Sequence, residues 1–80
     1  MADEFTPAKE RFISLVREID PDVTVVIPER STQDAFRISL TRGGNRRFMT
    51  VSEDDMLDLA EDEHAAKKLH AKLRQEVAAL

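Results

Sequence analysis

A short arginine-rich segment carries the residues of this sequence that are best suited to contact a ligand. Residues 34–51 contain four arginines, and within them Arg37, Arg42, Arg46 and Phe48 are our candidate binding residues. Planar guanidinium groups beside an exposed aromatic ring suit phosphate contact and base stacking, as on sheets that bind single-stranded nucleic acid. The same side chains also suit a solvated face or a contact with another protein, and the formal net charge of −4 favours these two alternatives.

The spacing of apolar residues predicts that this segment is a β-hairpin. Apolar and polar residues alternate, as in a strand with one buried face, and Gly43-Gly44 suits a two-residue turn. With that turn Phe48 points outward, whereas a loop one residue longer would turn it inward. The pairs predicted by the short turn are Phe36 with Val51, Ile38 with Met49, Thr41 with Arg46, and Arg42 with Asn45.

A second group of candidate residues lies in the C-terminal segment, which has helical spacing. Lys67, Lys68 and Lys72 are basic residues suited to contact phosphate groups. The same segment carries an apolar stripe, and its packing on the sheet is the simpler interpretation. A stripe that overhangs the sheet would instead dock on a second copy of the chain or on a peptide. The stripe consists of Leu69, Leu73, Val77 and Leu80.

Several kinds of chemistry have no matching residue pattern. The two glycines are adjacent, so neither a P-loop nor a dinucleotide-binding fingerprint can be written, and without cysteine there is no thiolate metal site. Glu61 and His64 have the i, i+3 spacing of two metal ligands on one helix, but a solvated face is expected in a segment with seven acids over 52–64. The acids show no convergent catalytic arrangement. The sequence therefore predicts no enzyme, no cofactor and no metal.

Length and composition predict one small domain. We expect a single domain over 1–80, with residues 1–5 flexible. The chain has no long apolar run and no cysteine, so we expect neither a signal peptide nor a membrane helix and place the protein in the cytoplasm. Monomer and homodimer both stay open.

End signals and apolar spacing predict the secondary structure. Residues 7–19 have helical spacing behind Thr6, a good N-cap. The mostly β-branched residues 23–27 indicate a short strand with Val23, Val25 and Ile27 facing the core and Thr24 and Val26 on the outer face. After the hairpin, Ser52 is expected to cap a helix that starts at 53. A polar stretch then interrupts the apolar stripe, so the segment 53–79 is either one helix or, as we favour, two helices that meet near 62.

These elements predict an α+β fold in the order α-β-β-β-α, with a three-stranded antiparallel meander and the helices on one face. The order resembles that of double-stranded RNA-binding domains, and residues 65–72 (AAKKLHAK) resemble the lysine-rich helix that such domains lay on RNA phosphates. The resemblance implies phosphate contacts by the lysines of this helix. Those domains have basic residues at the helix start, whereas this chain has three acids at 61–63, so we interpret the resemblance as one of fold.

The residues together predict a small non-catalytic binding module that contacts another protein. The alternative is nucleic-acid binding, RNA in particular, through the arginines of the hairpin or the lysines of the C-terminal helix. No membrane contact is expected.

Overall fold

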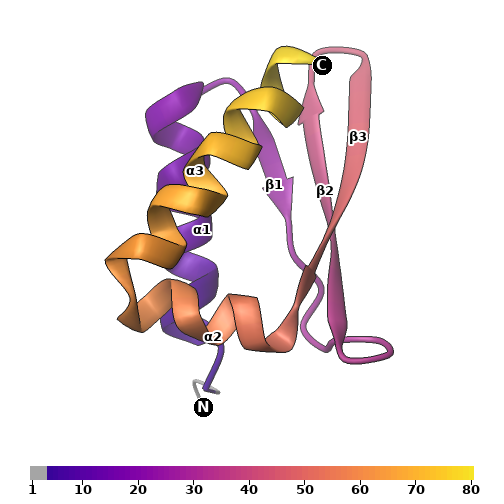
Figure 1. The fold of residues 1–80 in the computed structure, drawn as a ribbon. Coiled ribbons are helices and arrows are strands. Elements are labelled where there is room, and N and C mark those ends of the chain that lie inside the picture. Colours follow the sequence, from indigo (N-terminus) through magenta and orange to yellow (C-terminus); the bar gives the residue numbers. More distant parts are fainter. Residues whose placement is uncertain (1–3) are drawn as a thin grey trace.

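Three helices cover one face of a three-stranded antiparallel sheet (Figure 1). The computed structural model describes residues 4–80. The strands lie in the order β1-β2-β3, so neighbours in the chain are neighbours in the sheet. This arrangement confirms the predicted α+β fold, with the last helix split in two. The elements are α1 Thr6–Ile19, β1 Thr24–Val26, β2 Ala35–Arg42, β3 Asn45–Ser52, α2 Glu53–Glu61 and α3 Glu63–Ala78.

The β2–β3 hairpin has the predicted register. Ile38 lies opposite Met49, and Arg42 lies opposite Asn45, with Gly43 and Gly44 as the loop. Gly43 has a φ of +60°, whereas Gly44 does not have a positive φ. This is the pattern of a hairpin turn that requires a positive φ only at its first central residue. Because a longer loop would shift β3 by one residue, this short turn decides which side chains of β3 face the helices.

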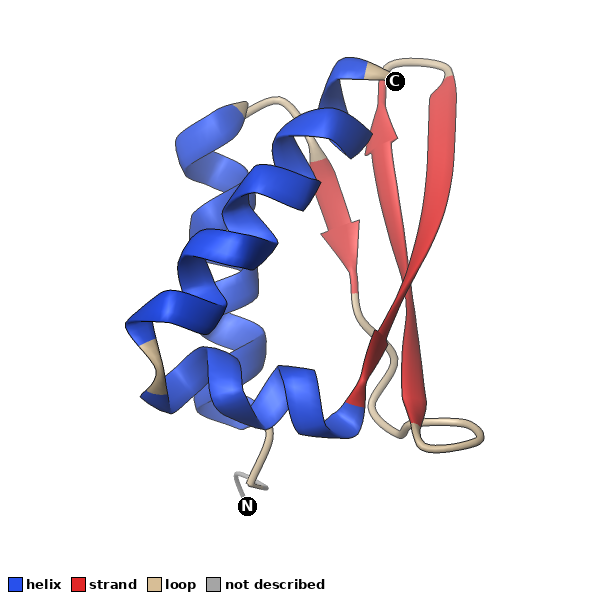
Figure 2. Cartoon of the chain, in the orientation of Figure 1, coloured by secondary structure: helices blue, strands red, loops and turns tan. Residues whose placement is uncertain are grey.

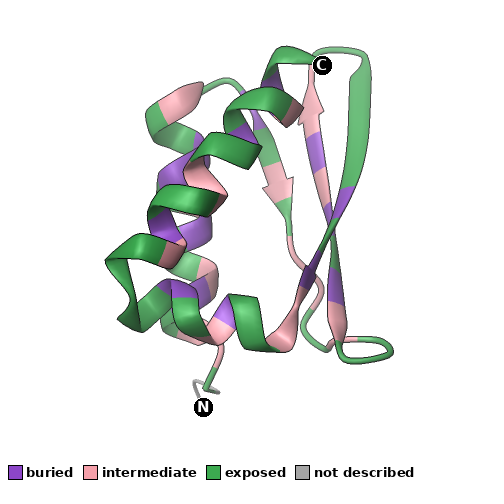
Figure 3. Ribbon diagram, in the orientation of Figure 1, coloured by how far each residue is buried: buried purple, intermediate pink, exposed green. Residues whose placement is uncertain are grey.

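The inner face of the hairpin builds the core together with the helices (Figure 3). Phe36 is 1% exposed, and Ile38 and Leu40 are fully buried. In α3, Leu73 and Val77 are buried and Leu69 packs against the core, as does Leu80 just after the helix. This confirms that the apolar stripe packs on the sheet side of the molecule. Within residues 4–80, no helix is long and apolar enough to cross a membrane.

β1 is shorter than predicted. It spans Thr24–Val26 rather than 23–27, and Val23 lies buried just before it. Thr24 pairs with Thr41 and Val26 with Ser39, so β1 lies along the second half of β2. The alternation is as predicted, because Thr24 and Val26 are exposed while Val25 lies against the core.

The start of α1 differs from the prediction. Thr6 is the first helical residue and not the cap; the N-cap position is Phe5, which makes no side-chain capping hydrogen bond. Pro7, whose fixed φ suits a first turn, and the packing of Phe5 edge-on against Phe36, with 5.0 Å between ring centroids, set this helix start instead. Phe5 belongs to the segment expected to be flexible, and residues 1–3 of that segment lie outside the described residues.

Two polar side chains define the ends of α2 and α3. The Ser52 hydroxyl accepts a hydrogen bond from the main-chain N–H of Asp55 at 3.1 Å, which confirms the predicted cap of α2. Asp62 has extended backbone, and its carboxylate accepts the N–H of His64 at 2.9 Å. Figure 2 shows the break between α2 and α3 as a short loop in tan. This cap starts a new helix without glycine or proline, so the segment 53–79 is two helices, as favoured.

Candidate binding surface

The outer face of the sheet is open, because the helices of the described chain, residues 4–80, all lie on its inner face (Figure 2). Strand pairing places Val26, Ser39 and Phe48 in one row across the three strands. Val26 is 58% exposed and Phe48 50%, and they are the exposed large apolar side chains within residues 4–80. Since Ser39 is small and polar, the row has two apolar ends and a low centre.

Arg37 packs on Phe48 at one end of this row. Its guanidinium carbon lies 4.5 Å from the centroid of the Phe48 ring, within the range of a cation–π contact. The register explains the contact, because Ser39 is opposite Phe48 and Arg37 is the next residue of β2 on the same face. The predicted outward position of Phe48 is thereby confirmed. The pair presents a cation and an aromatic ring side by side to solvent.

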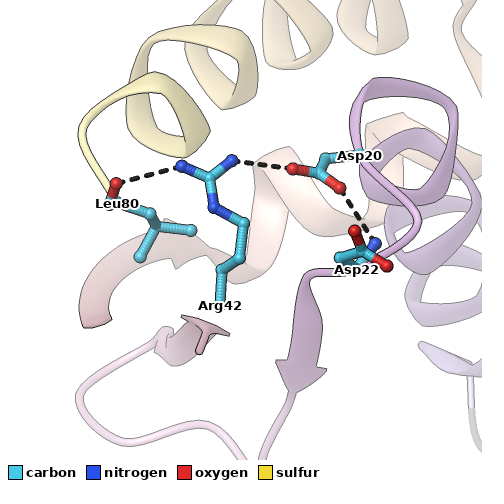
Figure 4. A network of polar contacts seen from close by, with 4 residues as sticks. All are labelled: Asp20, Asp22, Arg42 and Leu80. Carbon is cyan, nitrogen blue, oxygen red and sulfur yellow. Dashed lines mark hydrogen bonds and ion pairs between the residues drawn. The ribbon is translucent and has the colours of Figure 1, made fainter. Parts of the chain in front are cut away.

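Arg42 is held in a polar network at the turn end of the sheet (Figure 4). Its Nη1 donates to Oδ2 of Asp20 at 2.7 Å, and its Nη2 donates to the main-chain oxygen of Leu80 at 3.0 Å. Oδ1 of Asp20 also accepts the N–H of Asp22, and these contacts, the Arg42 hydrogen bond first, lower the pKa of Asp20 below its ordinary value. Arg42 therefore ties the end of α1 to the end of the chain beyond α3.

The four hairpin arginines divide into two pairs. Arg47 donates from Nε to Oε2 of Glu76 at 2.9 Å and connects β3 with α3, while Arg42 has Asp20. Arg37 and Arg46 contact no carboxylate within residues 4–80, so their charge is available to a partner. We call the surface they share the outer-face patch; it consists of Val26, Arg37, Ser39, Arg46 and Phe48.

Three acids of residues 52–64 stabilise helix ends or contact another side chain. Glu53 begins α2, where acids offset the helix dipole, and its Oε1 accepts the Ser31 hydroxyl at 2.7 Å. Asp62 caps α3, and Glu63 lies 3.7 Å from the guanidinium of Arg11. The strongly negative segment thus has a structural explanation for these three acids.

The three candidate lysines lie on two sides of α3. Lys67 lines a groove between α1 and α3. Lys68 and Lys72, one turn apart, line a cleft of about 260 Å³ between β3 and α3, which we call the β3–α3 cleft. Its other walls are formed by Thr50, Val51, Asp55, Ala65 and Leu69. The lysines therefore form two separate groups, of which only Lys68 and Lys72 face the hairpin.

Glu61 and His64, the two residues with the spacing of metal ligands, lie in different helices. Glu61 ends α2 and His64 lies in the first turn of α3, so the helical i, i+3 geometry does not apply across the break at Asp62. Both side chains are exposed, and no group of three or more metal-ligating residues occurs in residues 4–80.

The β3–α3 cleft is the feature that the sequence does not predict. Apolar spacing assigns Val51 and Leu69 to the core and Lys68 and Lys72 to solvent, and no local pattern shows that these residues meet. The available signal is the i, i+4 spacing of the two lysines on either side of Leu69, which puts two cations beside an apolar position.

No family model matches the chain, and no curated protein or solved structure matches it significantly.

Proposed function

We propose that this protein is a non-catalytic binding module that contacts another protein through its outer-face patch. The observation that supports this proposal is the combination of exposed apolar side chains with cations that have no carboxylate within residues 4–80. Phe48 and Val26 supply apolar contact area, and Arg37 and Arg46 supply charge. Aromatic residues and arginine are the residues most enriched where interfaces gain their binding energy.

The composition of the patch also supports a non-catalytic role. The five patch residues include no histidine, aspartate or glutamate, so the Ser39 hydroxyl has no general base beside it on that face. We place the protein in the cytoplasm, in keeping with its lack of cysteine.

Single-stranded nucleic acid is the second candidate ligand of the same patch. The observation in its favour is the guanidinium group of Arg37 on the ring of Phe48, since arginine and aromatic side chains both stack on bases. Two features favour a protein instead. The patch offers one aromatic ring, and the formal net charge of −4 repels a polyanion at long range.

Partner capture with matched arginine variants tests the proposal. The immobilised wild-type protein is incubated with extract of its source cells, with and without nuclease. The same is done with the double variant Arg37→Ala/Arg46→Ala, and with Arg17→Ala/Arg74→Ala, which removes the same charge from exposed helix positions. We expect a nuclease-resistant protein that the wild type and the helix variant retain and that the patch variant loses at least tenfold.

Two results contradict this proposal. Retention by the patch variant equal to the wild type would exclude the outer-face patch as the contact. Retention that disappears with nuclease would instead favour nucleic acid, and a titration of the backbone amides with RNA and DNA at two salt concentrations would then show whether the patch or α3 carries it.

A further inference from the structure

We propose that the outer edge of β3 binds an extended acidic segment of the partner protein as a fourth strand of the sheet. This inference rests on the proposed function, because it names how the partner is held and which charge it carries. Side chains of an added strand alternate between the two faces of a sheet. One set would reach the outer-face patch, and the other set would reach the β3–α3 cleft.

The first observation is the unpaired edge of β3. Its eight residues pair with β2 on one side only. Within residues 4–80, no main-chain hydrogen bond from another segment reaches residues 46–51. A row of free N–H and C=O groups along a strand edge is a template for pairing with another chain.

The turn identifies which groups of this edge are free. The two-residue loop is closed by the pair Arg42 and Asn45, and main-chain groups alternate in direction along an antiparallel ladder. The N–H and C=O groups of Arg46, Phe48 and Thr50 therefore point away from β2. These three residues also carry their side chains on the outer face.

The opposite edge of the sheet does not offer such a site. β1 has three residues, and Pro21 and Pro28 stand before and after it. Short strands and flanking prolines are devices that prevent pairing at a sheet edge. The long edge of β3 contains no proline, and this difference assigns the pairing site to β3.

The second observation is that the β3–α3 cleft borders this edge. Thr50 and Val51 both line the cleft, although their side chains point to opposite faces of the sheet. A cleft that meets two consecutive residues of a strand must pass along its main chain. α3 forms the facing wall, and the contact between Arg47 and Glu76 lies between the same two elements, nearer the hairpin turn.

Charge identifies the partner as acidic. The hairpin from Ala35 to Ser52 contains no acid, its Arg37 and Arg46 contact no carboxylate within residues 4–80, and Lys68 and Lys72 add two cations across the cleft. Asp55 is the single acid in the cleft lining. A segment with carboxylates at alternate positions would place them near Arg46 on one side or near the two lysines on the other.

A second copy of this chain fits the edge less well than an acidic segment. Pairing of two β3 edges would bring the second copy's Arg46, which contacts no carboxylate within residues 4–80, next to Arg46 of the first copy, while the second copy's Arg47 would come with its own Glu76. Like charges at paired edges oppose association. Dimerisation through β3 is therefore an outcome that the experiment must separate from peptide binding.

Selection from a random library of eight-residue peptides tests the proposal, with the full-length protein immobilised. We expect enrichment of aspartate and glutamate and depletion of proline at the central positions. Enriched peptides that are basic or proline-rich, or a selection without enrichment, would overturn the proposal. Sedimentation of the free protein across a concentration series shows whether β3 pairs with itself, and a dimer disrupted by Phe48→Pro but not by Phe48→Ala would also overturn it.

A pair of neighbouring lysines provides the matched control for the cleft. Affinity of a selected peptide is measured by fluorescence anisotropy. We expect Lys68→Ala to weaken binding at least tenfold, and Lys67→Ala, which removes the same charge from the other side of α3, to change it less than threefold. Equal effects at Lys67 and Lys68 would show that only long-range charge attracts the peptide.

Methylation of the peptide's main-chain nitrogens tests strand pairing itself. Every second N–H of an added strand points at β3, so methyl groups on one alternate set should reduce affinity at least tenfold, and those on the other set far less. Similar losses for both sets would exclude a fourth strand. Capture that depends on the patch, together with a failed peptide selection, would overturn the strand proposal and leave the proposed function in place; loss of patch dependence would remove the proposed function.

Discussion

The two faces of the β2–β3 hairpin differ in how far the rest of the chain covers them. On the inner face, Ile38 and Leu40 are fully buried under helices, whereas on the outer face Phe48 is half exposed. Inner-face and outer-face residues alternate along the same two strands. The two faces therefore have the same backbone pairing and the same local strand propensity. The inner face of the hairpin is therefore buried in the core, whereas the outer face stays exposed and can contact a partner.

The charges of the molecule show the same contrast. The acids Glu53, Asp62 and Glu63 contact a hydroxyl, cap a helix or face an arginine, so the fold accounts for them. Among the hairpin arginines, Arg42 and Arg47 are likewise engaged by carboxylates. Arg37 and Arg46 are the two hairpin arginines without a carboxylate contact within residues 4–80, and the binding proposal is based on them.

The largest expected effect contrasts neighbouring residues on the two faces. Ile38→Ala removes a fully buried side chain and should lower the free energy of unfolding by about 2–5 kcal/mol. Ser39→Ala, on the outer face, should change it by less than about 0.5 kcal/mol. Urea unfolding followed by circular dichroism measures both. Similar losses for the two variants would mean that the outer face is covered in solution.

A smaller effect is expected from an arginine that the fold engages. Arg42→Met removes hydrogen bonds to Asp20 and Leu80 and should lower Tm by about 5 °C, a typical shift for losing a charge-assisted hydrogen bond in a small domain. Arg46→Met removes the same charge without an ion-pair partner in residues 4–80 and should leave Tm nearly unchanged. Calorimetry of both variants decides; a larger loss in Arg46→Met would remove the distinction between engaged and available arginines.

In the acid-rich segment 52–64, the N-cap role of Asp62 predicts an effect on stability. Asp62→Ala should destabilise the protein by about 1 kcal/mol, because the N–H of His64 loses its acceptor. Glu61→Ala, one residue earlier at the end of α2, should have no such effect. Chemical unfolding measures the two, and equal values would mean that the negative charge of this corner, and not the cap, is what the fold uses.

The smallest effect is a pH dependence that comes from Asp20. Its pKa in the folded protein lies below the ordinary value of 3.8, chiefly because Arg42 donates to the ionised carboxylate. The stabilisation is therefore complete above about pH 4 and is lost as the pH falls through the lowered pKa. We expect the Tm difference between wild type and Asp20→Asn to be largest near pH 6 and to shrink below pH 4. A difference that is constant from pH 6 to 2.5 would contradict this role.

Local pattern was sufficient for most of the fold. The two-residue Gly43-Gly44 turn determines the register of β3, so the outward position of Phe48 follows from the sequence. Ser52 is recognisable as a cap in the same way. The predicted N-cap of α1, Thr6, was wrong. The packing of Phe5 on Phe36, a contact between distant segments, outweighs the preference of threonine for the cap position.

The candidate site could be predicted only in part. Alternation places Arg37, Arg46 and Phe48, and also Val26, on one face of the sheet. It does not show that Arg42 reaches Asp20 or that Val26 pairs with Ser39, since both depend on how distant segments pack. The β3–α3 cleft depends on the angle at which α3 lies beside β3, which the break at Asp62 sets. Periodicity reports which face of an element is apolar and carries no information on such angles.

Site-specific photo-crosslinking tests the central claim most directly. A benzoylphenylalanine at position 48 replaces an exposed aromatic residue on the outer face, and the same group at position 10 probes an exposed site on α1. After irradiation in extract of the source cells, we expect nuclease-resistant protein adducts from position 48 and none of the same size from position 10. Adducts that appear equally at both positions, or at position 10 alone, would contradict a binding surface on the outer face of the hairpin.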